Sequence, residues 1–113
     1  MRSRKMKVVS LNNNNFETQV LKHSGVYAVR FWAEWCGPCR AMEPMYKAMA
    51  EEPAAKASFG EVDIDKSPEI AAAFGIRGVP TVILFKDGKP VEQVVGLREK
   101  SKYAALIEQL AAS

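Results

Sequence analysis

Residues 26–39 have the sequence Val-Tyr-Ala-Val-Arg-Phe-Trp-Ala-Glu-Trp-Cys-Gly-Pro-Cys. The first seven form a dense apolar run interrupted only by Arg30, and such a run predicts a strand that is covered on both faces. Residues 36 to about 51 are rich in Ala, Met, Glu and Lys, which is typical of a helix. The stretch therefore predicts a buried strand that leads directly into a helix, with Cys36 and Cys39 at the start of that helix.

The position of these cysteines predicts their chemistry. Unpaired backbone N–H groups at a helix start favour an anion, so a thiolate at Cys36 is stabilised, and the thiolate is the reactive form. Cys39 lies one turn further along, within reach of Cys36, and we expect it to be more buried and less reactive. Cys36 is thus predicted to attack a substrate disulfide, and Cys39 to resolve the mixed disulfide that forms. The alternative is a chance pair of buried structural cysteines.

The rest of the chain alternates between strand and helix patterns. Strands are predicted at 7–11, 57–64, 81–85 and 91–95, and helices at 16–22, 67–75 and 99–111, the second with a capping hydroxyl from Ser67. Asp87-Gly88 predicts a hairpin turn between the last two strands. This order indicates an α/β fold with a central mixed sheet and helices on both faces. No linker or repeat interrupts it, so we expect a single domain over residues 1–113.

Composition excludes several classes of function. The chain of 113 residues is 48% hydrophobic, enough for a core without a metal or structural disulfides. The net charge is +3, and positive and negative residues are scattered along the chain, so the charge pattern does not indicate a nucleic-acid-binding protein. Two cysteines and His23 cannot complete a four-ligand zinc site, and we expect no metal. No segment is long and apolar enough for a signal peptide or a membrane span, which favours the cytoplasm, where a Cys-x-x-Cys pair indicates redox chemistry.

Several motifs together resemble the thioredoxin family over essentially the whole chain from about Lys7. They are Phe31-Trp32-Ala33-Glu34-Trp35-Cys36-Gly37-Pro38-Cys39, Val62-Asp63-Ile64-Asp65, Gly75-Ile76-Arg77-Gly78-Val79-Pro80-Thr81, Phe85-Lys86-Asp87-Gly88 and Val95-Gly96. The resemblance implies the thioredoxin fold and a dithiol reductase of protein disulfides, recycled by thioredoxin reductase, a flavoprotein that draws on NADPH. The chain has no nucleotide-binding glycine pattern, so we expect no cofactor of its own. We also expect a monomer.

The resemblance further implies a docking surface beside the cysteines. Val79-Pro80 matches the cis-proline of the family, and a proline just before a strand leaves the preceding backbone free to pair with an extended substrate. By this resemblance the docking surface consists of Trp35, Gly37, Pro38, Gly78, Val79, Pro80 and Gly96. From the residues alone, Gly78 and Gly96 are as readily explained as turn glycines.

One position departs from the family pattern. Most thioredoxins carry a buried aspartate immediately before Phe-Trp-Ala, where this chain has Arg30, and usually a lysine on the neighbouring strand, where it has Glu61. A lone buried charge is costly, so we expect the two side chains to meet beneath the helix, shielded from water, in a contact that suits a bidentate fork. The alternative is that Arg30 extends to solvent and Glu61 lies near an edge.

The exchange bears on catalysis. In the family the buried aspartate is thought to take or relay the proton of the resolving cysteine, and arginine cannot, because it stays protonated. We expect Glu61 to take over, directly or through a water. The other reading is that no base remains and the positive field of Arg30 stabilises the Cys39 thiolate.

Two rival functions remain. One is a disulfide-forming oxidase or isomerase of an exported compartment, which the Gly37-Pro38 dipeptide and the missing signal peptide disfavour. The other is a subunit of a complex that uses the fold for binding, which the complete motif set disfavours.

Overall fold

The computed structural model describes residues 7–113. Most of the basic N-terminal stretch, in which no signal peptide was expected, therefore lies outside the described residues. The elements follow one another as β1 (Val8–Leu11), η1 (Glu17–Leu21), β2 (Val26–Trp32), α1 (Gly37–Glu51), β3 (Ser58–Asp63), α2 (Pro68–Ala73), β4 (Thr81–Lys86), β5 (Lys89–Val95) and α3 (Lys100–Ala112). This order matches the one predicted from the sequence, with boundaries that shift by a residue or two.

The strands form one mixed sheet in the order β1-β3-β2-β4-β5. β3 pairs in parallel with β1 and β2, whereas β4 is antiparallel to β2 and to β5. The hairpin between β4 and β5 turns at Asp87 and Gly88, whose φ angles are 53° and 85°. Such positive angles at both central residues fit the right-handed twist of the strands, and aspartate and glycine are among the residues that adopt them most readily.

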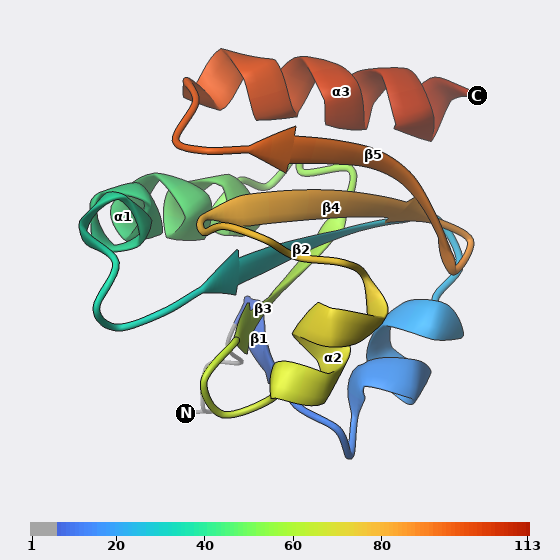
Figure 1. The fold of residues 1–113 in the computed structure, drawn as a ribbon. Coiled ribbons are helices and arrows are strands. Elements are labelled where there is room, and N and C mark those ends of the chain that lie inside the picture. Colours follow the sequence, from blue (N-terminus) through green and yellow to red (C-terminus); the bar gives the residue numbers. More distant parts are fainter. Residues whose placement is uncertain (1–6) are drawn as a thin grey trace, which may run out of the picture.

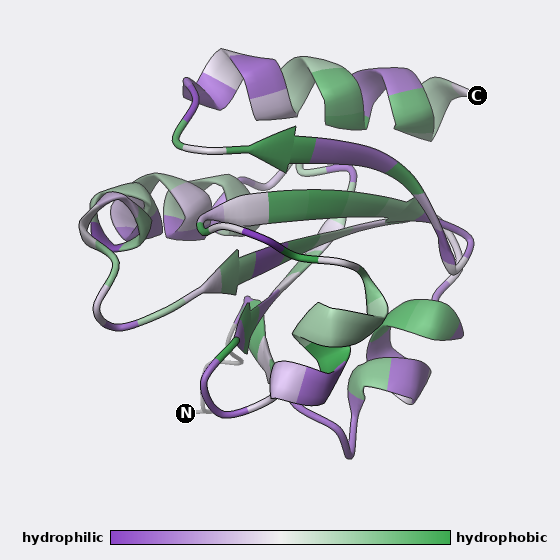
Figure 2. Cartoon of the chain, in the orientation of Figure 1, coloured by the Kyte–Doolittle hydropathy of each residue, from purple (hydrophilic) through white to green (hydrophobic). Residues whose placement is uncertain are grey.

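Helices cover both faces of the sheet, as the alternating pattern predicts (Figure 1). α1 and α3 lie on one face, and η1 and α2 lie on the other. The central strands β2 and β4 are buried along almost their whole length, and they are mostly apolar (Figure 2). Arg30 is the one charged residue in β2, which is otherwise apolar. Burial on both faces therefore explains why the β2 sequence lacks polar alternation.

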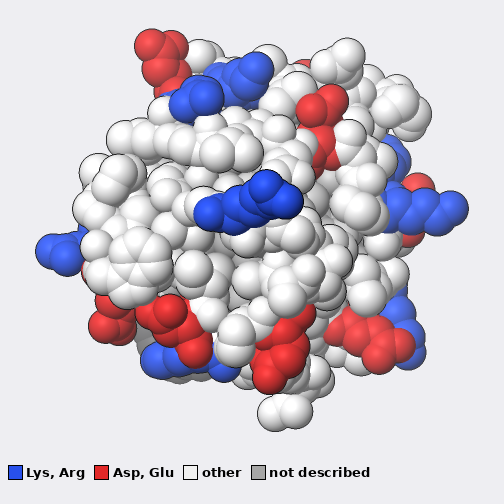
Figure 3. All heavy atoms as spheres, viewed as in Figure 1, with Lys and Arg blue, Asp and Glu red and all other residues white. Residues whose placement is uncertain are grey.

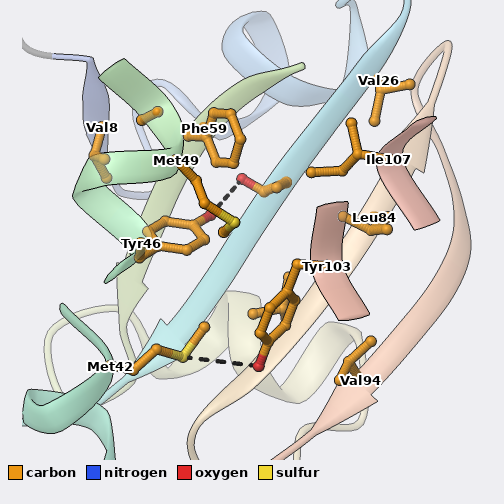
Figure 4. Close-up of a cluster of buried hydrophobic side chains, with 13 residues drawn as sticks. Val8, Val26, Met42, Tyr46, Met49, Phe59, Leu84, Val94, Tyr103 and Ile107 are labelled. Carbon is orange, nitrogen blue, oxygen red and sulfur yellow. Dashed lines mark hydrogen bonds between the residues drawn. The ribbon is translucent and has the colours of Figure 1, made fainter. Parts of the chain in front are cut away.

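The core beneath α1 and α3 also contains two tyrosines (Figure 4). The hydroxyl of Tyr46 on α1 lies 2.9 Å from the carbonyl oxygen of Ala28 and 2.8 Å from that of Gly60. Burial raises the pKa of Tyr46 well above its ordinary value, so the phenol stays protonated and can donate. Because Ala28 lies on β2 and Gly60 on β3, this hydroxyl ties α1 to two adjacent parallel strands.

Two local expectations need correction. The helix that carries the cysteines begins at Gly37, because Cys36 has extended backbone angles and acts as its N-cap. The hydroxyl of Ser67 makes no capping hydrogen bond to α2, although the side chain is buried and Pro68 occupies the first turn as expected. The segment η1 is a short π-helix.

The two edges of the sheet differ from its centre. β1 has only four residues. β5 begins with Lys89 and Pro90, carries Glu92 and Gln93, and is exposed along nearly all of its length. On the outer surface Lys and Arg side chains alternate with Asp and Glu over the face shown in Figure 3, without a large field of one sign. Within residues 7–113, none of the helices is long and apolar enough to cross a membrane.

Candidate active site

The two cysteines lie where β2 gives way to α1. Cys36 and Cys39 are joined by a disulfide, and their Cα atoms are 5.3 Å apart. Cys36 retains 5% of its exposure, whereas Cys39 is completely buried. The structure thus places the predicted attacking sulfur toward the outside and the predicted resolving sulfur beneath it.

The local backbone explains how the site favours an anion. The backbone N–H of Cys39 donates to Sγ of Cys36 at 3.1 Å, so Cys36 caps the helix through its own side chain. Pro38 stands in the first turn, where its missing N–H costs nothing. When the disulfide is reduced, the Cys36 sulfur is therefore held at the positive end of α1 with an N–H already directed at it.

The segment before β4 faces this pair. The Val79–Pro80 peptide bond is cis, as the sequence predicts. The carbonyl oxygen of Val79 lies 3.6 Å from Sγ of Cys36, and Val79 packs against the cluster formed by Ala33, Cys36 and Cys39. The carbonyl oxygen of Pro80 in turn accepts a hydrogen bond of 2.8 Å from the N–H of Gly96. The segments around Cys36 and Val79 therefore meet at the disulfide, and Gly96 is joined to them through Pro80.

The expected docking residues differ in exposure. Trp35, at 67%, is the most exposed large apolar residue of the described chain, and Gly37, Pro38 and Gly78 are also exposed. Val79 and Gly96 are half-buried and Pro80 is buried. A Cβ atom at Gly37 or Gly78 would meet nothing within 4 Å. Packing within the chain therefore does not require glycine at these two positions, whereas Gly96 has a φ of 90° that favours it.

Arg30 and Glu61 meet beneath the active-site helix, as predicted. They are paired in register on β2 and β3, and Nη2 of Arg30 lies 2.7 Å from Oε1 of Glu61. Arg30 is only 1% exposed, so the alternative of an arginine extended into solvent is excluded. The Glu61 side chain keeps 21% of its exposure, which makes it the wetter end of the pair.

The guanidinium does not form the bidentate contact that was expected. Its second amino group, Nη1, donates instead to the carbonyl oxygen of Cys39 at 2.8 Å. The arginine fork is therefore divided between a carboxylate and the backbone of the resolving cysteine. The Trp32 and Tyr46 rings each lie 5.5 Å from the guanidinium carbon, and such contacts partly offset the loss of hydration. Nε of Arg30 has no hydrogen-bond partner among the described residues.

Two contacts at the site were not predicted. One is the bond from Arg30 to the Cys39 carbonyl. The other is a hydrogen bond of 2.9 Å from the indole Nε1 of Trp35 to Oδ2 of Asp65, which fixes the exposed ring beside the disulfide. The sequence does hold a signal for the second, because Asp65 follows β3 and Trp35 follows β2. Parallel neighbouring strands end at the same edge of a sheet, so their following residues lie close together.

Comparisons with known proteins agree with this geometry. The family model described as Thioredoxin matches residues 7–109. Thioredoxin of Staphylococcus saprophyticus is 40% identical over 104 residues, which cover 92% of this chain and 98% of that protein. Thioredoxin of Staphylococcus haemolyticus is 38% identical with the same coverage.

Solved structures give the same result. A mutant thioredoxin from Halobacterium salinarum superposes with a TM-score of 0.85 at 33% identity, covering 97% of this chain and 96% of that one. Malassezia sympodialis thioredoxin gives a TM-score of 0.83 at 34% identity, covering 98% and 96%. With a disulfide between Cys36 and Cys39 at the start of α1, this chain therefore belongs to the thioredoxin family and is a dithiol oxidoreductase that reduces protein disulfides.

Proposed function

We propose that this chain is a general cytoplasmic electron carrier, a monomer of one domain spanning residues 1–113, which thioredoxin reductase recycles with electrons from NADPH. Flavin and nicotinamide then belong to the reductase. The observation that carries the proposal is the placement of Cys36 at the outer side of a helix start, facing the Val79 carbonyl, with Cys39 buried beneath it. In this arrangement the sulfur of Cys36 can react with a partner protein, and the buried sulfur of Cys39 remains available to resolve the mixed disulfide.

The reaction proceeds in two exchanges. The Cys36 thiolate attacks one sulfur of the substrate disulfide, a new bond joins Cys36 to that sulfur, and the other substrate sulfur leaves as a thiolate. Cys39 then loses its proton and attacks Cys36, which closes the disulfide between Cys36 and Cys39 and releases the second substrate sulfur. Two electrons pass to the substrate, and its two thiolates take up two protons. The substrate is reduced and the chain is oxidised.

Substrates are proposed to bind across the surface formed by Trp35, Gly37, Pro38, Gly78, Val79, Pro80 and Gly96. The free space around Gly37 and Gly78 supports this role, because a backbone without side chains lets a partner chain approach closely. The backbone just before β4 offers hydrogen-bonding groups to an extended peptide. A surface that recognises backbone and apolar area suits many unrelated disulfide-containing proteins.

We further propose that Glu61 accepts the proton of Cys39 through a water, while Arg30 holds the carboxylate in place. Oε1 of Glu61 is bound to Arg30, but no described residue forms a hydrogen bond to Oε2. Glu61 is partly exposed, so water can reach its carboxylate. It lies on β3, next to β2, whose Arg30 contacts the backbone of Cys39.

Glu61→Gln tests this role, because glutamine keeps the size and can still accept a hydrogen bond from Arg30 but cannot take a proton. We expect resolution of the mixed disulfide to slow by about tenfold or more, and its formation to change little. Stopped-flow kinetics that separate the two steps give the measurement, with Glu108→Gln as a control far from the cysteines. Unchanged resolution would remove the proton-transfer role.

The proposed electron route is tested by reduction of insulin disulfides with NADPH and thioredoxin reductase. We expect NADPH oxidation that depends on both the chain and the reductase, with the Cys36→Ser variant inactive. If dithiothreitol but not the reductase supports insulin reduction, the proposed partner is wrong. If the chain instead oxidises reduced, unfolded ribonuclease A more effectively than it reduces insulin, an oxidase role replaces the reductase role.

A further inference from the structure

The contact between Arg30 and the Cys39 carbonyl places a permanent positive charge directly beneath the resolving cysteine. The guanidinium is 1% exposed and stays protonated at all relevant pH values, so neither water nor titration removes its charge. The Cys39 sulfur lies within about 5 Å of its own carbonyl oxygen by covalent geometry. The sulfur therefore lies within about 8 Å of Nη1, a separation at which charges in a protein interior still interact appreciably.

The counterion offsets only part of this field at Cys39. Glu61 binds the opposite amino group of the guanidinium and is the partly exposed member of the pair. The ion pair is therefore oriented with its positive end toward the cysteine and its negative end toward solvent. A charge near water is screened more effectively than one in the interior.

The remaining surroundings of Cys39 contain few other ionisable groups. It packs with Ala33, Cys36, Trp32, Ile64 and Val79, of which only Cys36 titrates. On α1 the nearest charged residues are Arg40, which is exposed, and Glu43, which is half-buried and paired with Lys47. β2 and β3 contribute Arg30, Glu61 and, at the end of β3, Asp63, and Asp65 just after β3 binds the indole of Trp35. Among these groups, Arg30 is the buried charge in direct contact with Cys39.

We propose that Arg30 is an electrostatic positioning residue for the second step, which stabilises the Cys39 thiolate and so promotes resolution near neutral pH and favours the reduced dithiol in alkaline solution. The inference rests on the proposed function, because it concerns the resolving role of Cys39. It differs from the proton-transfer role of Glu61, because it concerns the equilibrium acidity of Cys39 and not the path of its proton.

The direction in which Arg30 changes the acidity of Cys39 follows from the attraction between a positive charge and a thiolate. A nearby positive charge lowers the pKa of a thiol, so more Cys39 thiolate is present at a given pH below that pKa. Replacing Arg30 by an uncharged side chain should reduce this thiolate fraction about tenfold. The remaining thiolate is more nucleophilic, which offsets part of the loss, so resolution should slow about threefold. In alkaline solution the stability of the reduced dithiol relative to the disulfide should fall about tenfold, which corresponds to a potential about 30 mV more negative.

The decisive experiment titrates Cys39 alone, in a Cys36→Ser background, by the ultraviolet absorbance of the thiolate. Arg30→Met removes the charge while keeping a long apolar side chain, Arg30→Lys retains a charge, and Glu61→Gln removes the counterion. We expect the titration midpoint to rise in Arg30→Met, to stay near the parent value in Arg30→Lys, and to fall in Glu61→Gln. The alkaline redox equilibrium with glutathione, measured with both cysteines present, should shift in the corresponding directions.

An unchanged midpoint in Arg30→Met overturns the proposal and leaves Arg30 a purely structural residue. If Arg30→Met does not fold, the titration of Cys39 in Glu61→Gln tests the proposal instead. A Cys39 midpoint in Glu61→Gln that is equal to or above the parent value overturns it. The titration uses no substrate and no reductase. A failed insulin assay together with the expected midpoints therefore counts against the proposed function alone.

Discussion

Cys39→Ser is expected to leave the substrate covalently attached to Cys36 and to reduce steady-state disulfide reduction by about a thousandfold or more. The Cys36 sulfur retains its place at the helix start and the N–H of residue 39, so the first exchange proceeds. The serine hydroxyl is then a very weak nucleophile toward the mixed disulfide, and no other cysteine is present in the chain to replace it.

Intact mass spectrometry after mixing with a disulfide-containing protein should show a complex of one chain and one substrate, which dithiothreitol releases. Cys36→Ser is the matched control, and it should form no such complex because Cys39 is completely buried. Alkylation of the reduced parent protein at neutral pH provides an independent check. If the first equivalent of reagent modified Cys39, the two sulfurs would have exchanged roles.

Removing Glu61 is expected to cost about 3–5 kcal/mol of unfolding free energy, since it leaves the charge of Arg30 buried without a counterion. Glu61→Leu tests this cost, because leucine supplies neither charge nor hydrogen bond. Arg30→Met should lower the unfolding free energy by less than Glu61→Leu does, even though Arg30 makes more contacts than Glu61. The carboxylate that remains is partly exposed and can recover hydration, whereas an orphaned guanidinium at 1% exposure cannot.

Urea denaturation of the oxidised variants gives the comparison. Glu108→Leu is a suitable control, because its pair with Lys56 is exposed on both sides and should contribute little. The double variant Arg30→Asp with Glu61→Lys restores the charge order that is usual in the family and should recover much of the lost stability. If the two single variants cost no more than the surface control, the buried pair is not energetically important.

Much of this site can be predicted from sequence because its parts follow strong local rules. The apolar run before Cys36 indicates a strand buried on both faces, and the Cys-Gly-Pro-Cys sequence after it indicates a helix start. The meeting of Arg30 and Glu61 follows from the high cost of an unpaired buried charge. Each of these inferences depends on chemistry that leaves few alternatives.

The predictions that were wrong concern hydrogen bonds for which several similar partners compete. The Arg30 guanidinium can bind both oxygens of the Glu61 carboxylate, or one of them together with the carbonyl oxygen of Cys39. The relative placement of β2, β3 and α1 determines that it does the second. Ser67 illustrates the same limit. Its position before Pro68 is typical of a helix cap, yet the hydroxyl makes no capping bond. Sequence patterns identify which groups need partners, but three-dimensional packing selects the partners.

The composition of the two sheet edges has a consequence for self-association. A sheet edge presents unpaired N–H and C=O groups on which another copy of the chain can add a strand and begin an aggregate. Here the β1 edge is only four residues long, and the β5 edge carries a lysine and a proline at its start. A short strand gives little area for pairing, and proline offers no N–H to a neighbour. A short β1 edge and the lysine and proline at the start of β5 therefore disfavour edge-to-edge addition of further copies.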